Sequence, residues 1–375
     1  MQSGTKHSFL RVFVCFIIAI WMTGCTASSH LNEGPRYCGP HSIVFSTAGT
    51  AYLLGYSQLL AISSQGNIIN NETVPNFYGQ TSDMLDISNN GNIWEVTNDS
   101  GNNPTILTIY NSQGYFVTQM ATDFHLLNSV KVSPSTDIGW IGGQNYIGTG
   151  VITSELKVLN INGQSLTSFT LPEITTSNDG WFGWLSTVKL AISFSNGTIW
   201  AWSPGYLSGY SFTGLVYGPY PVNLSESSDY SNQEQIGCGV NEKWIIVNPV
   251  SNDIWMGNPA TTTILALSPD GTVRFQKNLD INISTMAVSP KTGNVWIGSN
   301  NRIVVLDPYG NIIKQLTFNN LNCITYMAIS PVDNTVWVGN ETNISNTEKN
   351  IIILDDNGNI VNSIYVPVRC AYPLM

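Results

Sequence analysis

Charge is scarce in this sequence. Charged residues make up 10% of its 375 residues, and 24 Asp and Glu outnumber 14 Lys and Arg. The formal net charge of −10 becomes −12 when Lys6 and Arg11 of the N-terminal segment are left out. The basic residues form no cluster, and a nucleic-acid partner needs one. We therefore expect no nucleic acid among the partners.

Histidine is also scarce, and recognisable catalytic motifs are missing. The chain has 4 histidines and contains no His-Glu-x-x-His, no Gly-x-Ser-x-Gly and no Cys/His metal spacing. We therefore expect no metal and no cofactor. His125, close to Asp123, is a weak candidate for a catalytic base; the alternative is a loop histidine held by its neighbours. Whether the protein is an enzyme is left open, with a non-catalytic role favoured.

Sustained helical periodicity with caps is missing, and an internal repeat of about 40 residues takes its place. The stretch from Met286 to Gly298 recurs from Met327 to Gly339, each with Ser-Pro early and Trp late. Each repeat reads as four short strands bounded by Gly, Pro, Asn and Asp. The aromatic residue of the second strand marks seven repeats, at Tyr52, Trp94, Trp140, Trp200, Trp255, Trp296 and Trp337. We predict an all-β, seven-bladed β-propeller of four-stranded blades over residues 42–375, with these aromatics packed between blades.

A polar residue followed three positions later by glycine marks the turn between the third and fourth strands. The polar oxygen can accept hydrogen bonds from the turn, and glycine takes the positive φ. Ser or Asn replaces Asp in four of the six pairs, which favours a turn over a calcium loop. The repeat around Trp200 lacks this signature and is the least regular. The pairs are Ser63/Gly66, Asn111/Gly114, Asn160/Gly163, Ser268/Gly271, Asp307/Gly310 and Asp355/Gly358.

The N-terminal segment predicts export. A basic stretch is followed by the apolar run Val12–Trp21, which is too short to span a bilayer comfortably. Met22-Thr23-Gly24-Cys25 then resembles the lipobox of bacterial lipoproteins. The resemblance implies a signal peptide over 1–24, a lipidated Cys25 that anchors the protein to a membrane, and a polar tether over 25–41. Thr26 implies sorting to the outer membrane in a Gram-negative cell envelope, where the protein would face the periplasm or the surface. The alternative to a lipoprotein signal is an ordinary secretory signal peptide.

Four cysteines remain in the exported chain. An even number suggests two disulfides, and four cysteines allow three pairings. Cys38 precedes the first predicted strand and Cys370 follows the last, while neither terminal blade borrows a strand from the other end of the chain. We therefore predict a Cys38–Cys370 disulfide that closes the ring, with Cys238–Cys323 left by elimination.

Long connections are predicted on one face, where the second-to-third and fourth-to-first strand loops emerge, and binding sites often lie on such loops. The loops around the fourth repeat are rich in aromatic rings next to carboxylates, which suits binding of a sugar or a peptide. The alternative is that these rings plug an irregular blade. Asp86 and Lys131 are expected near the axis as a buried polar pair, for which a structural role is favoured. The predicted binding residues are Trp181, Trp184, Trp202, Tyr206, Tyr217 and Tyr220.

Two motifs carry a family resemblance that covers most of residues 43–366. Ser-Pro-x-x-Gly-x-Val-Trp-Val-Gly, followed by Ile-x-x-Leu-Asp-x-x-Gly, resembles NHL-type and streptogramin-lyase-like propellers. The lyase branch has Trp-Phe-Thr-Glu where this chain has Trp296-Ile-Gly-Ser, and no catalytic residue of that branch has a matching position. The favoured function is a lipid-anchored, non-catalytic binding or scaffolding module whose partner is an envelope protein or a glycan. The alternative is an extracytoplasmic lyase or hydrolase with its site at the mouth of the central channel.

Overall fold

The computed structural model divides the chain into two units, Met1–Arg36 and Tyr37–Met375, and the second holds the fold. The described residues are 37–38, 42–55, 58–74, 84–97, 105–147, 151–172, 188–222, 224, 243–258, 262–319, 321, 324–340, 342–343 and 350–366. The predicted signal peptide and Cys25 lie outside them. Within the described ranges, no helix is long and apolar enough to cross a membrane.

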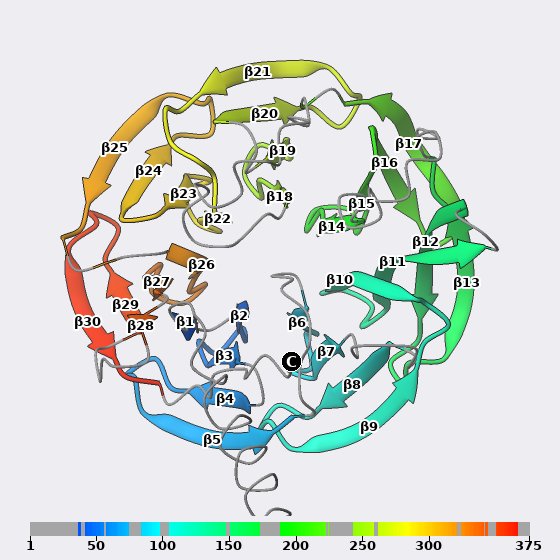
Figure 1. Ribbon diagram of the computed structural model, residues 1–375, viewed down its shortest axis with the longest axis horizontal. Helices are drawn as coiled ribbons and strands as arrows, with labels where there is room; N and C mark the ends of the chain where they lie inside the picture. Colours follow the sequence, from blue (N-terminus) through cyan, green and yellow to red (C-terminus); the bar gives the residue numbers. More distant parts are fainter. Residues whose placement is uncertain are drawn as a thin grey trace, which may run out of the picture. The chain divides into compact units, whose positions relative to one another are not determined.

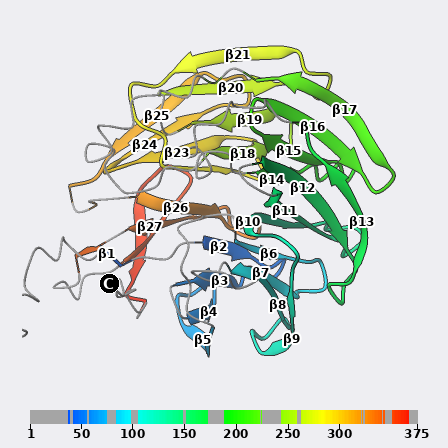
Figure 2. The ribbon, with the colours of Figure 1, turned by 45° about the vertical axis from the view of Figure 1, so that its right-hand side comes forward.

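The second unit is a ring of blades, as predicted (Figure 1). The described residues form seven four-stranded antiparallel sheets and one two-stranded ribbon. Each blade consists of its own four strands in chain order, with the first strand innermost and the fourth outermost. Figure 2 shows the blades from an oblique direction. The all-β, seven-bladed propeller is therefore confirmed.

The strands are as follows. Blade 1 is β2 (Ser42–Phe45), β3 (Ala51–Leu54), β4 (Gln58–Ile62) and β5 (Ile68–Thr73); blade 2 is β6 (Leu85–Ile87), β7 (Ile93–Thr97), β8 (Ile106–Tyr110) and β9 (Phe116–Ala121); blade 3 is β10 (Leu126–Val132), β11 (Gly139–Ile147), β12 (Val151–Leu159) and β13 (Ser165–Thr170); blade 4 is β14 (Lys189–Ile192), β15 (Ile199–Ser203), β16 (Tyr206–Ser211) and β17 (Gly214–Pro221). Blade 5 is β18 (Trp244–Val247), β19 (Ile254–Gly257), β20 (Thr263–Leu267) and β21 (Val273–Asn278); blade 6 is β22 (Thr285–Val288), β23 (Val295–Ser299), β24 (Arg302–Leu306) and β25 (Ile312–Thr317); blade 7 is β26 (Ile324–Ile329), β27 (Val336–Asn340), β29 (Ile351–Leu354) and β30 (Ile360–Ile364).

Burial follows the position of a strand in its blade. The second strand of blade 6, β23, is buried along its whole length, because sheets pack on both of its faces. The outermost strand of the same blade, β25, alternates between exposed and half-buried residues, the pattern of a strand with one face in water. Blade 5 shows how the half-buried face is used: Phe275 of its outermost strand contacts Trp255 of its second strand edge-on, at 4.8 Å between ring centroids.

The aromatic residues of the second strands are all buried, and the predicted packing between blades is seen at the junction of blades 7 and 1. Trp94, Trp200, Trp255 and Trp337 are among the largest fully buried side chains. Trp337 of blade 7 meets Phe45 of blade 1 edge-on at 5.5 Å, so an aromatic pair spans the junction between the first and last blades.

All six predicted glycine turns form. In each, the glycine has a φ between +79° and +87° and donates its N–H to the carbonyl of the polar residue three positions earlier. In the turn of blade 6, Asp307 Oδ1 also accepts from the N–H groups of Tyr309 and Asn311. Blade 4, the least regular repeat, has its four strands but reaches β17 through the shorter turn Phe212–Thr213.

The ring closes without a shared blade, as predicted, but with a strand pairing that the sequence did not reveal. β1 (Tyr37–Cys38) pairs antiparallel with β28 (Thr342–Asn343), which lies in the connection between the second and third strands of blade 7. The chain just before blade 1 is therefore hydrogen-bonded to blade 7. Cys238, Cys323 and Cys370 lie outside the described residues, so both disulfides stay predictions.

Candidate functional site

The ring has two different faces, which we name by their connections. In an antiparallel blade, the first-to-second and third-to-fourth connections leave from one end, and we call that end the tight-turn face. All fourteen of these connections have six residues or fewer. The other connections leave from the opposite end, the long-loop face. They include the stretches 74–84, 171–188 and 222–243, so the longest connections start and end at one face, as the sequence predicted.

The predicted binding residues around blade 4 do not all lie in loops. Trp181 and Trp184 lie outside the described residues. Trp202 is on β15 and is 2% exposed, with Lys243 Nζ 5.3 Å from the centre of its ring. Its environment is that of a core residue.

The predicted tyrosines are strand residues. Tyr206 begins β16 and is half-buried. Tyr217 and Tyr220 lie on β17, whereas the sequence analysis had predicted them in the loop that follows this strand. Tyr217 stacks on Trp200 with ring centroids 5.4 Å apart, and the Tyr220 hydroxyl donates to the Pro269 carbonyl at 3.4 Å. These rings pack within blade 4 and join it to blade 5, which agrees with the structural alternative for these two residues.

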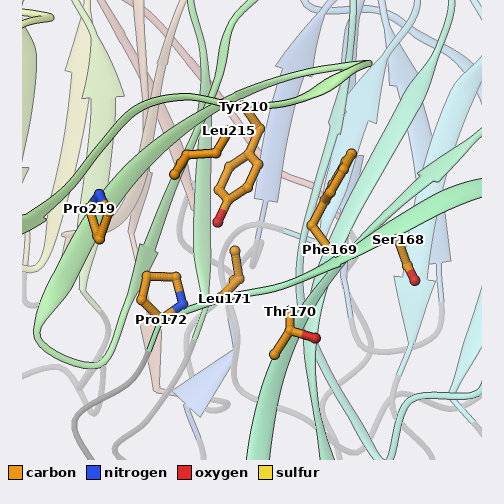
Figure 3. A pocket seen from close by; sticks show the side chains of 8 residues that line it. All are labelled: Ser168, Phe169, Thr170, Leu171, Pro172, Tyr210, Leu215 and Pro219. Atoms are coloured by element: carbon orange, nitrogen blue, oxygen red, sulfur yellow. The ribbon is translucent and has the colours of Figure 1, made fainter.

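A groove lies beside these tyrosines, between blades 3 and 4. Its volume is about 560 Å³, and Figure 3 shows the residues that line it. Phe169 of β13 and Tyr210 of β16, which stack at 5.4 Å between ring centroids, line the groove together with Leu215 and Pro219 of β17. β13 runs into the long connection 171–188, so the groove begins at the long-loop face.

His125 lies in a polar network at the end of blade 3. Its Nδ1 is 3.4 Å from Asn145 Oδ1, and Asn145 Nδ2 donates to Glu155 Oε2 at 2.9 Å. Lys157 Nζ, 4.7 Å from the centre of the Phe124 ring, pairs with Asp123 Oδ2 at 3.1 Å. His125 is exposed and its backbone N–H donates to the Gln144 carbonyl, so neighbouring groups hold it in place. This is the geometry expected of the held loop histidine.

A cavity of about 380 Å³ lies on the axis of the ring. Its walls come from the seven innermost strands, and it extends to the second residues of the tight turns, which include Phe194, Pro249, Pro290 and Pro331. Most of the wall is aliphatic or aromatic. Asp86 and Lys131 are its two charged residues among those that the structure describes, so the polar pair expected near the axis is found there. Asp86 Oδ2 accepts a hydrogen bond from the Val132 N–H at 2.6 Å, which ties blade 2 to blade 3.

A buried carboxyl group escaped the sequence analysis. Glu95 is 0% exposed and accepts a hydrogen bond from the Tyr110 hydroxyl at 2.6 Å. Burial raises the pKa of Glu95 to about 7, against the opposing effect of the Tyr110 hydrogen bond. The signal was in the repeat: the residue after the second-strand aromatic is apolar in the other six blades, as Leu53, Ile141, Ala201, Met256, Ile297 and Val338.

No metal centre emerges from the described part of the chain, where no group of three or more His, Cys, Asp or Glu side chains could hold an ion.

Comparison with known proteins gives the fold. No family model matches the sequence, and no curated protein matches it. The crystal structure of the β-propeller domain of Cps50 (Swd1) from Myceliophteria thermophila is similar, with a TM-score of 0.57 at 8% identity. The match covers 83% of this chain and 95% of that chain, and at this identity it shows the fold alone.

Proposed function

We propose that this chain is an exported, lipid-anchored β-propeller that acts as a non-catalytic binding or scaffolding module through its long-loop face. The observation that carries the proposal is the asymmetry of the connections. Tight turns of six residues or fewer close one face at all fourteen positions, while the other face carries connections as long as 171–188 and 222–243. A rigid scaffold with its variable loops on one side is the usual arrangement of a binding protein.

The chemistry around blade 4 supports a partner with apolar or ring-shaped groups. The groove between blades 3 and 4 begins at the long-loop face and offers the half-buried ring of Phe169, which stacks on the buried ring of Tyr210. Aromatic faces of this kind bind sugar rings or peptide side chains. Trp181 and Trp184, which belong to the connection that follows β13, are the aromatic residues we assign to the same surface. The partner is accordingly an envelope protein or a glycan.

Two experiments test the proposal. Metabolic labelling with a fatty acid should label the wild type and leave Cys25→Ala unlabelled; a labelled Cys25→Ala protein would contradict the anchor. Native protein extracted from membranes should retain a partner, which the Trp181→Ala, Trp184→Ala double variant loses. The matched control is Tyr309→Ala, because Tyr309 is an aromatic residue 82% exposed on the tight-turn face.

The same variants separate binding from catalysis. If Tyr309→Ala loses the partner as the double variant does, binding does not depend specifically on the long-loop face, and that part of the proposal is wrong. A hydrolytic or lyase activity that His125→Ala abolishes would replace the proposed role with the enzymatic one, because His125 is the one candidate base that the sequence offers on the long-loop face.

A further inference from the structure

The axial cavity extends to the tight-turn face, so it has no part in the proposed function. The innermost strands run from the long-loop face to the tight turns, and Trp244 and Tyr326 come early in β18 and β26, so both lie deep. Their ring centroids are 5.7 Å apart although blades 5 and 7 are not neighbours, so the two rings meet in the interior of the ring. We call them the floor of the cavity. Phe194, in a tight turn at the other end, is 62% exposed and marks the mouth.

The two charges in the wall are already compensated within the protein. Asp86 and Lys131 occupy the same position in the innermost strands of neighbouring blades, so their opposite charges can complement each other. Asp86 Oδ2 also accepts the Val132 N–H at 2.6 Å. A charged ligand would lose its water on entering the cavity without meeting an uncompensated charge of opposite sign, which costs binding free energy. The cavity therefore favours an uncharged ligand.

The rest of the wall is mainly apolar. The cavity volume of about 380 Å³ falls within the range of small-molecule sites, about 300–1,000 Å³. Thr47, Ser88 and Asn89 add polar groups at the mouth. The apolar wall between the mouth and the floor includes Val44, Ala191, Ile246, Met286, Val288 and Ala328.

The floor adds one hydrogen-bond donor. Trp244 is 2% exposed, and its indole Nε1 is buried with no hydrogen-bond partner in the part of the chain that the structure describes. A buried N–H group without an acceptor is costly, so a ligand that supplies an acceptor gains binding free energy. The floor therefore favours an apolar ligand with a polar oxygen over a plain hydrocarbon.

We propose that the axial cavity binds a small uncharged molecule with an apolar body and one hydrogen-bond acceptor, of the class of the ketones and esters. The apolar body contacts the Tyr326 ring and the aliphatic wall, and the carbonyl oxygen accepts the Trp244 N–H. The Asp86–Lys131 pair keeps its structural role and takes no part in charge recognition.

The first test compares molecules of similar shape by ligand-observed NMR titration of the full chain. Acetophenone is uncharged and carries a carbonyl oxygen, benzoate is an anion, and benzylamine is a cation at pH 7. Acetophenone is expected to bind with a Kd on the order of 1 mM or lower. Each ion is expected to bind more weakly by on the order of tenfold or more. Absence of acetophenone binding, or equal or tighter binding of either ion, would overturn the proposal.

A variant of the floor tests the hydrogen bond. Trp244→Phe keeps an aromatic ring and removes the N–H group. Acetophenone should then lose affinity on the order of fivefold relative to ethylbenzene, which has the same body and no acceptor. The comparison of two ligands on one variant cancels the change in the shape of the floor. If the ratio of the two affinities stays at its wild-type value, no hydrogen bond to Trp244 selects the ligand and the proposed class is wrong.

A second variant checks the location. Ala328→Phe places a ring in the cavity from its aliphatic wall and should abolish binding of acetophenone. The matched control is Val273→Phe, because Val273 is 56% exposed on the outermost strand of blade 5 and its substitution should leave binding unchanged. Retention of the partner by the long-loop face should survive both changes, which separates this site from the proposed function. Acetophenone binding that persists in Ala328→Phe with wild-type affinity would place the ligand elsewhere and defeat the assignment.

Discussion

Glu95 is the residue whose chemistry conflicts most with its surroundings. Its side chain faces Tyr110 inside blade 2, at a position where the equivalent residues of blades 6 and 7 are Ile297 and Val338. One carboxylate oxygen, Oε1, has no hydrogen-bond partner within the part of the chain that the structure describes. A buried carboxylate that lacks a full set of partners favours its protonated form, which is why its pKa rises.

This raised pKa predicts a pH-dependent stability. The pKa of Glu95 is about 7 in the folded protein, against an ordinary value of 4.5. The folded state therefore binds the proton more tightly than the unfolded state, and the free energy of unfolding falls as the pH rises from about 4.5 to about 7. Urea denaturation at a series of pH values should show this fall, on the order of 3 kcal/mol in total, and Glu95→Gln should abolish that part of it.

A second variant tests the cause. Tyr110→Phe removes the hydrogen bond that lowers the pKa of Glu95, so the fall in stability should continue above pH 7. If wild type and Glu95→Gln lose stability in parallel over the whole pH range, Glu95 does not titrate as inferred.

At the scale of the element, the glycine turns link neighbouring blades. Gly310 of blade 6 has a φ of +82°, and a Cβ added there would lie 2.6 Å from Cζ of Phe275 in blade 5. Phe275 is itself packed against Trp255, so it cannot move away freely. The turn glycine therefore does two things: it adopts a left-handed conformation, and it leaves space for the side chain of the preceding blade.

Two alanine variants separate these effects. Gly197 has a φ of +70° and an added Cβ there would meet no atom within 4 Å, so Gly197→Ala introduces backbone strain alone, about 1–2 kcal/mol. Gly310→Ala introduces similar strain and also a steric clash, which adds about 1–3 kcal/mol. Chemical denaturation should therefore find Gly310→Ala the more destabilised of the two. Equal losses would mean that Phe275 adjusts without cost.

The elements also show what the sequence could and could not predict. The turns at Gly310 and its counterparts could be predicted, because their conformation depends on residues next to each other in the chain. The pairing of β1 with β28 could not, because two-residue strands have no periodicity and their partners are about 300 residues apart.

β17 was misplaced for a different reason. It contains Gly214, Gly218, Pro219 and Pro221, which are typical of turns. An outermost strand has a free edge and tolerates proline there, so these residues did not end the strand, and Tyr217 and Tyr220 stayed in the blade.

The axial position of Asp86 and Lys131 could be predicted from the repeat, whereas the cavity between them and Trp244 depends on how all seven blades meet.

At the scale of the whole molecule, the ring is chemically uneven. In the third strand of every blade, the residue that pairs with the one after the second-strand aromatic is buried. In blades 2, 3 and 4 this residue is polar, as Thr108, Lys157 and Ser208. In blades 1, 5, 6 and 7 it is aliphatic, as Leu60, Leu265, Val304 and Ile352. Burial of aliphatic surface stabilises a contact between blades by about 25 cal/mol per Å², while burial of a polar group costs free energy unless it is fully hydrogen-bonded.

Because a repeat protein is stabilised largely by contacts between neighbouring units, this difference predicts uneven local opening. Hydrogen exchange with mass spectrometry should find faster exchange in β8 and β16 than in β24 and β29. The comparison is matched, since these are all third strands with antiparallel partners on both sides. Equal protection in all four strands would show that backbone hydrogen bonding, and not the chemistry between blades, sets the opening free energy. Slower exchange in blades 2 and 4 would mean that their polar networks stabilise the ring more than aliphatic packing does.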